Sequence, residues 1–377
     1  MDLDLSDDQV ALRQAVRAVL ERECPITSVR AVVEKDEDTE GLWATMVSLD
    51  WPALAAAPAD GGLGLGTVEL AVLAEELGRA VAPTPLLATA SQFVPAVSLA
   101  GDEVQRARFV GAVAGDGLAG TLAVAEGAGP VSAGAVTTTA TPDGDGFVLQ
   151  GCKDDVFDAG RADELVVAAR LPGTAGEDGI GLFVVPRSAT RTERLVSLDA
   201  SRPLGSVILD GVRVDRSRVL GDPATPAPAA ALARALDVAT VALAADMVGA
   251  CQSILDIVLA YAKTREQFGV KIGTFQSLKH KMADMYVALE SARTTAWFAA
   301  AALDEDDERA PLAVAMAKAS AGECQKLLTK EGIQCLGGIG FTWEHDMHLY
   351  VKRAKASAAL FGTSAEHRAR VATLVGL

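Results

Sequence analysis

The hydrophobic pattern of this chain changes twice along its length, and no other feature constrains the fold as strongly. Residues 1–117 carry apolar side chains at intervals of three and four, which predicts helices. Residues 118–221 carry short runs of Val and Thr between Asp-Gly turns, which predicts a β-sandwich or barrel. Residues 231–377 return to helical spacing over long stretches, as in a helix bundle. The sequence therefore predicts a mainly α protein with a helical N-terminal domain, a β middle domain and a C-terminal helix-bundle domain.

Local signals place individual elements within these domains. Ser6 and Gln9 have the spacing of a capping box, so a helix should begin the protein. A Gly-rich run at residues 58–66 predicts a loop, and residues 102–113 should form another helix. A linker rich in Pro and Ala should precede the bundle at residues 222–230. Strands of the middle domain are expected at Phe147–Gln150, Glu164–Ala169, Gly181–Val185 and Ser206–Leu209.

Charge and hydropathy narrow the classes of function. The formal net charge is −16, which argues against a surface that binds nucleic acid. The acidic N-terminus lacks the basic and apolar regions of a signal peptide, so a cytoplasmic protein is expected. We expect no membrane-spanning segment, because the apolar stretch from Ala229 to Ala262 is interrupted by charged residues. These residues are Arg234, Asp237, Asp246 and Asp256.

Cysteines and histidines suggest neither disulfides nor metal. The five cysteines show no Cys-x-x-Cys spacing, so buried free thiols are expected. They are Cys24, Cys152, Cys251, Cys324 and Cys335. His345 and His348 lie close in sequence but have no third ligand at a suitable spacing, so we predict no metal site.

The most informative segment for chemistry runs from Tyr261 to Met285. Arg265 can form charge-assisted hydrogen bonds with phosphate oxygens, and Phe268 offers a flat apolar face. Gln276 can both donate to and accept from a nucleotide. On spacing alone, an exposed helix end followed by a glycine turn remains the alternative interpretation.

The motif around these residues, Arg-x-x-Phe-Gly followed by Gly-x-Phe-Gln, resembles the flavin-binding signature of acyl-CoA dehydrogenases. Residues 333–363 are similar to the Gln-x-x-Gly-Gly segment, the arginine-rich helix and the Gly-Thr turn of that family. The N-terminal loop at 58–66 is also similar, so the resemblance covers nearly the whole chain. It implies the family's fold, with a C-terminal four-helix bundle, and FAD as cofactor.

In that family one FAD lies across a subunit boundary, and the resemblance implies roles for individual residues. Arg265 would contact the FAD pyrophosphate of a neighbouring subunit, Phe268 the flavin–ribityl region and Gln276 the adenosine half. Gln334, Gly337 and Gly338 would approach the same nucleotide, although a turn between helices is the alternative for the glycines. Thr363, in the Gly-Thr turn, is also implied in the cofactor site.

Departures from the family pattern fall on the half of the site that a subunit supplies to its own flavin. The family's Thr-Glu-Pro-x-x-Gly-Ser segment appears here as AEGAGP, with Ala125 in place of the Thr and Pro130 in place of the Ser. The family's Trp-Ile-Thr appears as Asp155-Val156-Phe157. Two hydroxyl groups that would bond the flavin or the substrate region are therefore missing.

The catalytic base is also missing from both positions that the family uses. One position, directly before the Gly-Thr turn, holds Phe361, and the other, in the first long helix of the bundle, holds Ala239. A dehydrogenase needs a carboxylate there to remove the α-proton of the acyl-CoA. Asp246 and Glu366 are possible substitutes without special support. Asp237 would point about 200° away from the expected helix face.

The sequence therefore predicts a subunit of an FAD-dependent acyl-CoA dehydrogenase that completes the FAD site of a catalytic partner in a heterotetramer. The resemblance implies an acyl-CoA substrate, bulky esters such as steroid side chains by analogy, and electron-transfer flavoprotein or a similar acceptor. One alternative is a self-sufficient homotetramer with an unusual base such as Glu366. Another is a non-catalytic structural or regulatory protein on the same fold, and oxygen-using relatives rank lower.

Overall fold

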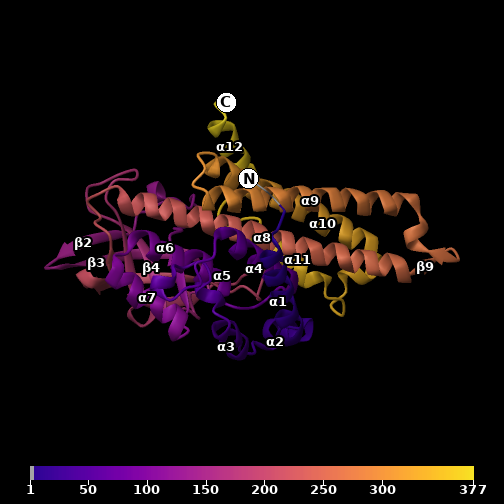
Figure 1. Ribbon diagram of the computed structural model, residues 1–377, viewed down its shortest axis with the longest axis horizontal. Helices are drawn as coiled ribbons and strands as arrows, with labels where there is room; N and C mark the ends of the chain where they lie inside the picture. The colour runs from indigo at the N-terminus through magenta and orange to yellow at the C-terminus, as the bar shows by residue number, and fades with distance from the viewer. Residues whose placement is uncertain (1–3) are drawn as a thin grey trace. The chain divides into compact units, whose positions relative to one another are not determined.

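The computed structural model describes residues 4–377, which divide into two compact units (Figure 1). One unit contains the N-terminal residues up to Glu37 together with Thr67–Pro83 and Thr240–Leu377. The other contains Asp38–Gly66 and Thr84–Ala239. Each unit therefore combines segments that are far apart in the sequence.

The second unit is built on one mixed sheet of eight strands with the path β6-β7-β3-β2-β4-β5-β8. Strand β1 lies off this path and pairs with β4 in parallel, whereas most other pairs are antiparallel. The strands are β1 Gly120–Ala123, β2 Thr139–Asp143, β3 Gly146–Phe157, β4 Glu164–Arg170, β5 Ile180–Pro186, β6 Arg191–Arg194, β7 Leu204–Val214 and β8 Val219–Leu220. Its longer helices are α3 Glu40–Ser48, α6 Val94–Ala100 and α7 Glu103–Gly115, with the short α5 Leu86–Ala88 before α6.

The centre of this sheet is apolar on both faces. Along β4, Val166 and Ala168 pack in a cluster with residues of α6 and α7, such as Phe109. The alternate residues Leu165 and Val167 pack in a second cluster. Since successive side chains of a strand point to opposite faces, β4 and its neighbour β5 need nearly continuous apolar sequence.

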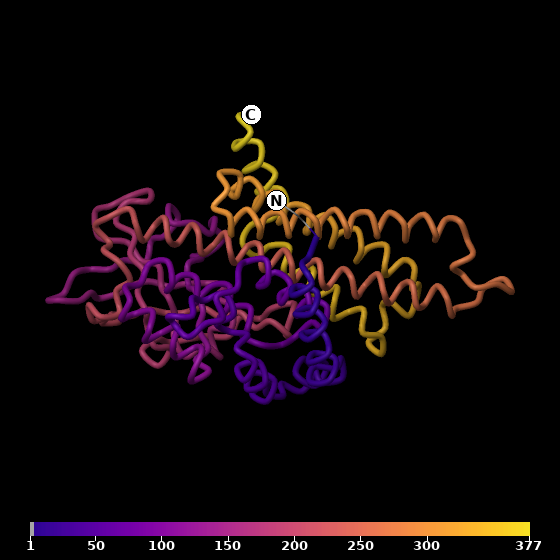
Figure 2. Tube along the Cα trace, in the orientation of Figure 1, coloured from indigo at the N-terminus to yellow at the C-terminus, as the bar shows by residue number. Residues whose placement is uncertain are grey.

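The first unit is helical. Its helices are α1 Asp7–Glu23, α2 Ile26–Lys35, α4 Thr67–Ala80, most of α8 Ala227–Thr264, α9 Gln276–Asp304, α10 Ala310–Leu336, α11 Met347–Ser357 and α12 Ser364–Leu374. Figure 2 shows the chain passing from α8 to α9 through a hairpin at the far end of these long helices. The hairpin consists of β9 Glu266–Gln267 and β10 Val270–Lys271.

Most of the expected elements are confirmed. Ser6 and Gln9 form a reciprocal capping box at the start of α1, and α7 covers the helix expected at 102–113. All four expected strands lie within β3, β4, β5 and β7. By length and composition α8 holds a window apolar enough to cross a membrane, but 94% of that window is buried in the protein. Helix α8 is thus a core helix, and its charged residues do not interrupt it.

Helices α4 and α8 cross in backbone contact within the first unit. A Cβ atom placed on Gly78 would lie 1.9 Å from the carbonyl oxygen of Asp246, and one on Gly249 would lie 1.8 Å from that of Glu75. No side chain larger than hydrogen fits at either position. Both glycines sit inside helices, where Gly costs roughly 1 kcal/mol relative to Ala, so the close crossing is what offsets this cost.

The crossing places Asp246 opposite a buried arginine of α11. Arg353 Nη1 lies 3.1 Å from Asp246 Oδ1, and both side chains are 1% exposed. Arg353 Nη2 also donates to the carbonyl oxygen of Ala82, at 3.4 Å. A buried charge without a partner is strongly destabilising, so this pair ties α11 to α8 and to the end of α4.

We predict that Gly249→Ala lowers the stability of the protein by about 3 kcal/mol, because the added methyl group forces α4 and α8 apart. Thermal unfolding followed by circular dichroism measures the effect. Gly41→Ala is the matched control, since Gly41 also lies in a helix and a Cβ added there would meet nothing within 4 Å. Equal melting temperatures for the two variants would contradict the tight crossing.

Candidate functional site

The hairpin between α8 and α9 and the start of α9 carry three of the predicted nucleotide residues. Phe268 is 93% exposed, and its φ of 55° is rare for an aromatic residue. Arg265 and Gln276 are also exposed, and neither side chain has a hydrogen bond or ion pair with the described part of the chain. The ring of Phe268 meets that of Phe275 edge to face, with ring centres 6.1 Å apart. These groups point outward and remain available to another molecule.

A second outward segment follows at the end of α10. Gln334, Gly337 and Gly338 are exposed, and the amide of Gln334 has no partner among residues 4–377. Gly337 has φ 66° and ψ −140°, a conformation that only glycine adopts readily. Each glycine leaves open space where a Cβ would be, so a ligand can approach the backbone closely.

The turn at 361–363 holds Phe361 where the family's base would be, and this residue has a φ of 53°. Thr363 caps α12: its hydroxyl accepts from Glu366 N at 3.3 Å. Glu366 Oε2 in turn accepts from the backbone N–H of Thr363 at 2.7 Å and from its hydroxyl at 2.9 Å. These two hydrogen bonds lower the pKa of Glu366, so its carboxylate is a weak base.

Sequence reasoning missed Lys318, which lies beneath this turn. Its side chain is completely buried, and Nζ donates to the carbonyl oxygens of Gly362 at 2.8 Å and Ser357 at 3.2 Å. Burial lowers the Lys318 pKa to about 8, and the nearby Glu366 carboxylate opposes this shift. The signal in the sequence was a single Lys within the Ala-rich first half of α10. The hydrogen bonds of Lys318 and the one between His367 Nε2 and Phe361 O, 2.8 Å long, together hold the turn at 361–363 in place.

In the sheet unit, the Asp155-Val156-Phe157 segment offers no hydroxyl. Asp155 lies at a bulge of β3 with φ 52°. Its partial burial, and to a smaller extent the negative charge of Asp154, raise the pKa of the Asp155 carboxyl. Phe157 is 3% exposed, and the Arg202 guanidinium lies 5.8 Å from its ring centre. The ring is therefore directed into the unit.

Glu126 is the acid that remains of the family's Thr-Glu-Pro segment, and its carboxylate already has several hydrogen-bond donors. Glu126 accepts from Lys153 Nζ at 2.5 Å, from the Thr138 N–H at 2.9 Å and from the Thr137 N–H at 2.7 Å. Burial alone would raise the Glu126 pKa, but the Lys153 ammonium and these donors bring it to about 2. Lys153 is itself buried, which lowers its pKa to about 8 against the pull of Glu126. Glu126 is therefore a poor base near neutral pH.

No carboxylate stands at the second position for the base. Ala239 is 1% exposed within α8, and Asp246 further along this helix is committed to Arg353. Among residues 4–377, no group of three or more His, Cys, Asp or Glu side chains could hold a metal ion.

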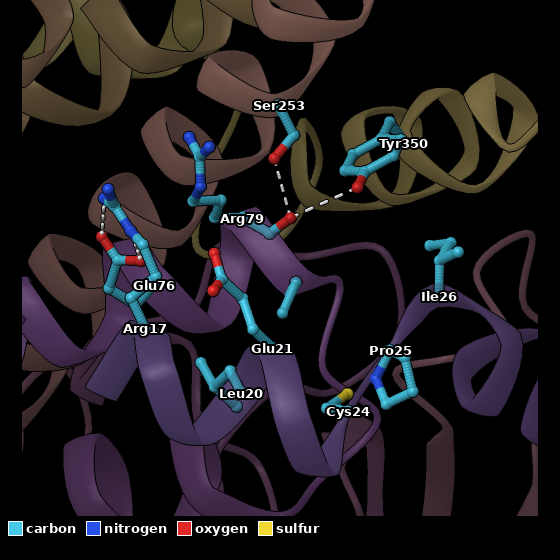
Figure 3. A pocket seen from close by; sticks show the side chains of 11 residues that line it. Arg17, Leu20, Glu21, Cys24, Pro25, Ile26, Glu76, Arg79, Ser253 and Tyr350 are labelled. Atoms are coloured by element: carbon cyan, nitrogen blue, oxygen red, sulfur yellow. Dashed lines mark hydrogen bonds and ion pairs between the residues drawn. The ribbon is translucent and has the colours of Figure 1, made fainter. Parts of the chain in front are cut away.

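A pocket of about 240 Å³ lies elsewhere in the helical unit, between the ends of α1 and α4 (Figure 3). Its arginines are already paired: Arg17 with Glu76 at 2.6 Å and Arg79 with Asp256 at 2.7 Å. None of the predicted nucleotide residues lines this pocket. The lining residues are Arg17, Leu20, Glu21, Cys24, Pro25, Ile26, Glu76, Arg79, Ala80, Ser253 and Tyr350. It therefore offers no free cation for a phosphate.

Comparison with known proteins identifies the family. Residues 6–116 match the N-terminal domain of acyl-CoA dehydrogenases, and residues 229–375 match the C-terminal domain. The chain is also 31% identical over 369 residues to acyl-CoA dehydrogenase IpdE2 of Mycolicibacterium smegmatis, covering 97% of this chain and 98% of that protein. The chain belongs to the acyl-CoA dehydrogenase family.

Two solved structures share the whole fold. The Tcur3481–Tcur3483 steroid ACAD is 32% identical, with a TM-score of 0.86 over 98% of both chains. A chain of the ChsE4–ChsE5 complex from Mycobacterium tuberculosis is 24% identical, with a TM-score of 0.89 over the full length of both, and shows the same fold. The order of helical part, mixed sheet and helical part along this chain is thus that of the family.

FAD is the cofactor of acyl-CoA dehydrogenases, and the structure fits it on one side only. Arg265, Gln276 and Gln334 are exposed cationic and amide groups without partners in the described chain, as a nucleotide requires. By contrast, Asp155 brings a carboxylate and Phe157 a buried ring to the positions where the family resemblance predicts contact with the flavin.

We predict that Glu126 stabilises the fold above its ordinary pKa of 4.5 and that this contribution disappears as pH falls toward 2. The folded-state pKa is the lower one, so the unfolded chain takes up the proton first. Urea unfolding of wild type and Glu126→Gln should differ by roughly 3 kcal/mol at pH 7 and progressively less toward pH 3. The exposed Glu193 supplies the control variant Glu193→Gln. A difference between wild type and Glu126→Gln that is independent of pH would refute the assignment.

Proposed function

We propose that this chain is a subunit of an FAD-dependent acyl-CoA dehydrogenase that completes the FAD site of a catalytic partner and lacks the base itself. The observation that carries the proposal is an asymmetry. Nucleotide-binding side chains directed outward are present and unpaired, whereas those needed for the chain's own flavin are replaced. The mixed enzyme would be a heterotetramer with one FAD for each pair of unlike chains.

The exposed residues at the α8–α9 hairpin, the start of α9 and the end of α10 would bind the partner's FAD. Arg265 would bind the pyrophosphate, Phe268 would pack near the flavin–ribityl region, and Gln276 would bond the adenosine half. Gln334 and the backbone at Gly337 and Gly338 would approach the same nucleotide. Each of these groups is exposed, which supports binding to a molecule held by another chain. Thr363 stays in the proposal as a cofactor-site residue, although its hydroxyl serves as a helix cap.

The chemistry requires both an acceptor and a base. When bound, FAD would supply an acceptor for the hydride from the β-carbon of an acyl-CoA, and a carboxylate would have to remove the α-proton. Phe361 and Ala239 cannot take this proton. Glu126 and Glu366 are held as charged, hydrogen-bonded carboxylates, which makes them poor bases. The partner chain would therefore supply the base, and substrate would react beside the partner's flavin.

Similar proteins support a partner of the same family. Two of the similar solved structures are named for two chains, Tcur3481–Tcur3483 and ChsE4–ChsE5. The first of these is a steroid ACAD, which favours a bulky acyl-CoA substrate here as well. We further propose three domains, at residues 1–117, 118–221 and 231–377, a cytoplasmic location and transfer of electrons to an electron-transfer flavoprotein or a similar acceptor.

We predict that the purified chain alone is colourless and that co-expression with a catalytic acyl-CoA dehydrogenase from a neighbouring gene gives about one FAD for every two chains. Flavin absorbance after denaturation, divided by protein concentration, measures this ratio. Arg265→Ala in this chain should lower it. A yellow chain that alone reduces an electron acceptor with an acyl-CoA would end the proposal in favour of a self-sufficient enzyme.

We predict that Glu366→Gln leaves turnover of the mixed enzyme within about two-fold of wild type, because Gln also forms the capping box with Thr363. If Glu366 were the base, turnover would fall by roughly 10² to 10⁴. Steady-state kinetics with a dye acceptor distinguishes the two outcomes. The structural or regulatory alternative is tested by Arg265→Ala, which under that alternative leaves the partner's FAD content unchanged.

A further inference from the structure

Two ion pairs flank the exposed segment Gln334–Trp343, which we call the nucleotide segment. The first pair joins Lys281 Nζ of α9 to Glu331 Oε2 of α10. Glu331 lies three residues before Gln334, and its side chain is 12% exposed. Lys281 lies five residues after Gln276, so the pair connects the helix starting at one predicted nucleotide residue with the helix ending near another.

The charge of Lys281 affects the pKa of groups at the start of the nucleotide segment. Its hydrogen bond is the main cause that lowers the pKa of Glu331. Burial raises the pKa of the Cys335 thiol, and the Lys281 charge opposes this rise. Since Cys335 is adjacent to Gln334, the ammonium lies within electrostatic reach of the segment's first residues.

The second pair holds the other end of the segment from α2. Arg30 Nε bonds Asp346 Oδ1 at 2.7 Å, and Nη2 donates to the carbonyl oxygen of Trp343 at 2.8 Å. The Trp343 indole stacks on His348 with ring centres 4.3 Å apart. Lys352 Nζ lies 4.4 Å from the centre of the same indole. The end of the segment is therefore fixed by a charge pair, a backbone contact and an aromatic stack.

Between the two pairs Cys335, Leu336 and Gly340 are buried, but the other residues of the segment are exposed. Gly337 and Gly338 have open space around them, and Phe341 is 79% exposed. A glycine-rich exposed segment loses conformational freedom when it binds a ligand, which weakens binding. Fixing its two ends in advance reduces that loss.

We propose that Lys281 and Arg30 are positioning residues that preorganise the nucleotide segment for the FAD held by the partner chain. The role rests on the proposed function. Neither residue needs to contact FAD, since each acts through the segment. Both pairs keep one partner more than a third exposed, and ion pairs open to solvent add little stability, so their effect should appear in nucleotide binding more than in folding.

The test uses the mixed enzyme stripped of FAD and titrated with FAD, with binding followed by flavin fluorescence. Lys281→Met and Arg30→Gln should each raise the Kd for FAD by roughly three- to ten-fold. Lys281→Arg, which keeps the charge, and the exchange Lys281→Glu with Glu331→Lys should restore most of the affinity. Lys326→Met is the matched control, because Lys326 is on α10 and its side chain has no partner among the described residues.

Hydrogen exchange on this chain alone measures preorganisation directly. Amides of residues 337–346 should exchange faster in Lys281→Met and Arg30→Gln than in wild type or Lys326→Met. Unchanged exchange in both variants overturns the inference, as does faster exchange with an unchanged Kd.

Arg265→Ala separates failure of this inference from failure of the proposed function. If Arg265→Ala weakens FAD binding and Lys281→Met and Arg30→Gln do not, only the positioning role is wrong. If Arg265→Ala has no effect on the Kd, the proposed function is wrong and the positioning role falls with it.

Discussion

The helical unit depends on the backbone contact between α4 and α8. Gly78 and Gly249 let the two helices approach until no other side chain would fit. This contact leaves Asp246 facing Arg353 in the interior, where the two charges must satisfy each other. Because interiors are close-packed, such a crossing has one arrangement and no neighbouring alternatives. Helix α8 is thereby held in place, and its C-terminal end carries the hairpin with Arg265 and Phe268.

The candidate carboxylates for the base share one property: each has a partner within the chain. Glu126 is held charged by Lys153 and Glu366 by the capping box, whereas Asp246 lies in the core paired with Arg353. A general base works best when its pKa lies near the working pH, which requires a carboxylate that is destabilised in its charged form. These three are stabilised in that form or locked in the core. The missing Glu of the family pattern has therefore not been replaced by a nearby acid with suitable properties.

Sequence motifs predicted Arg265, Phe268 and Gln276 as nucleotide residues because they lie within one short segment, and the structure shows all three exposed. Local signals also predicted the capping box at Ser6 and the strands of the sheet, since these depend on neighbours in sequence. Lys318 could not be found this way because a Lys in a helix is usually solvated, and only the packed turn at Gly362 shows that this one is buried. Lys281 and Glu331 are 50 residues apart, and no local pattern links them.

The sequence by itself determined the family, the order of helical and β parts, and which functional groups are present or replaced, because residue identity and short-range spacing carry that information. Tertiary structure decided which of those groups are free. Arg265 and Gln334 are available because they are exposed and their side chains have no hydrogen bond or ion pair within the described chain, whereas Glu126 is paired with Lys153, 27 residues away. Burial and ion pairing between distant residues arise only when the chain is folded. The sequence alone could therefore not show which charged side chains are paired and which are exposed and unpaired.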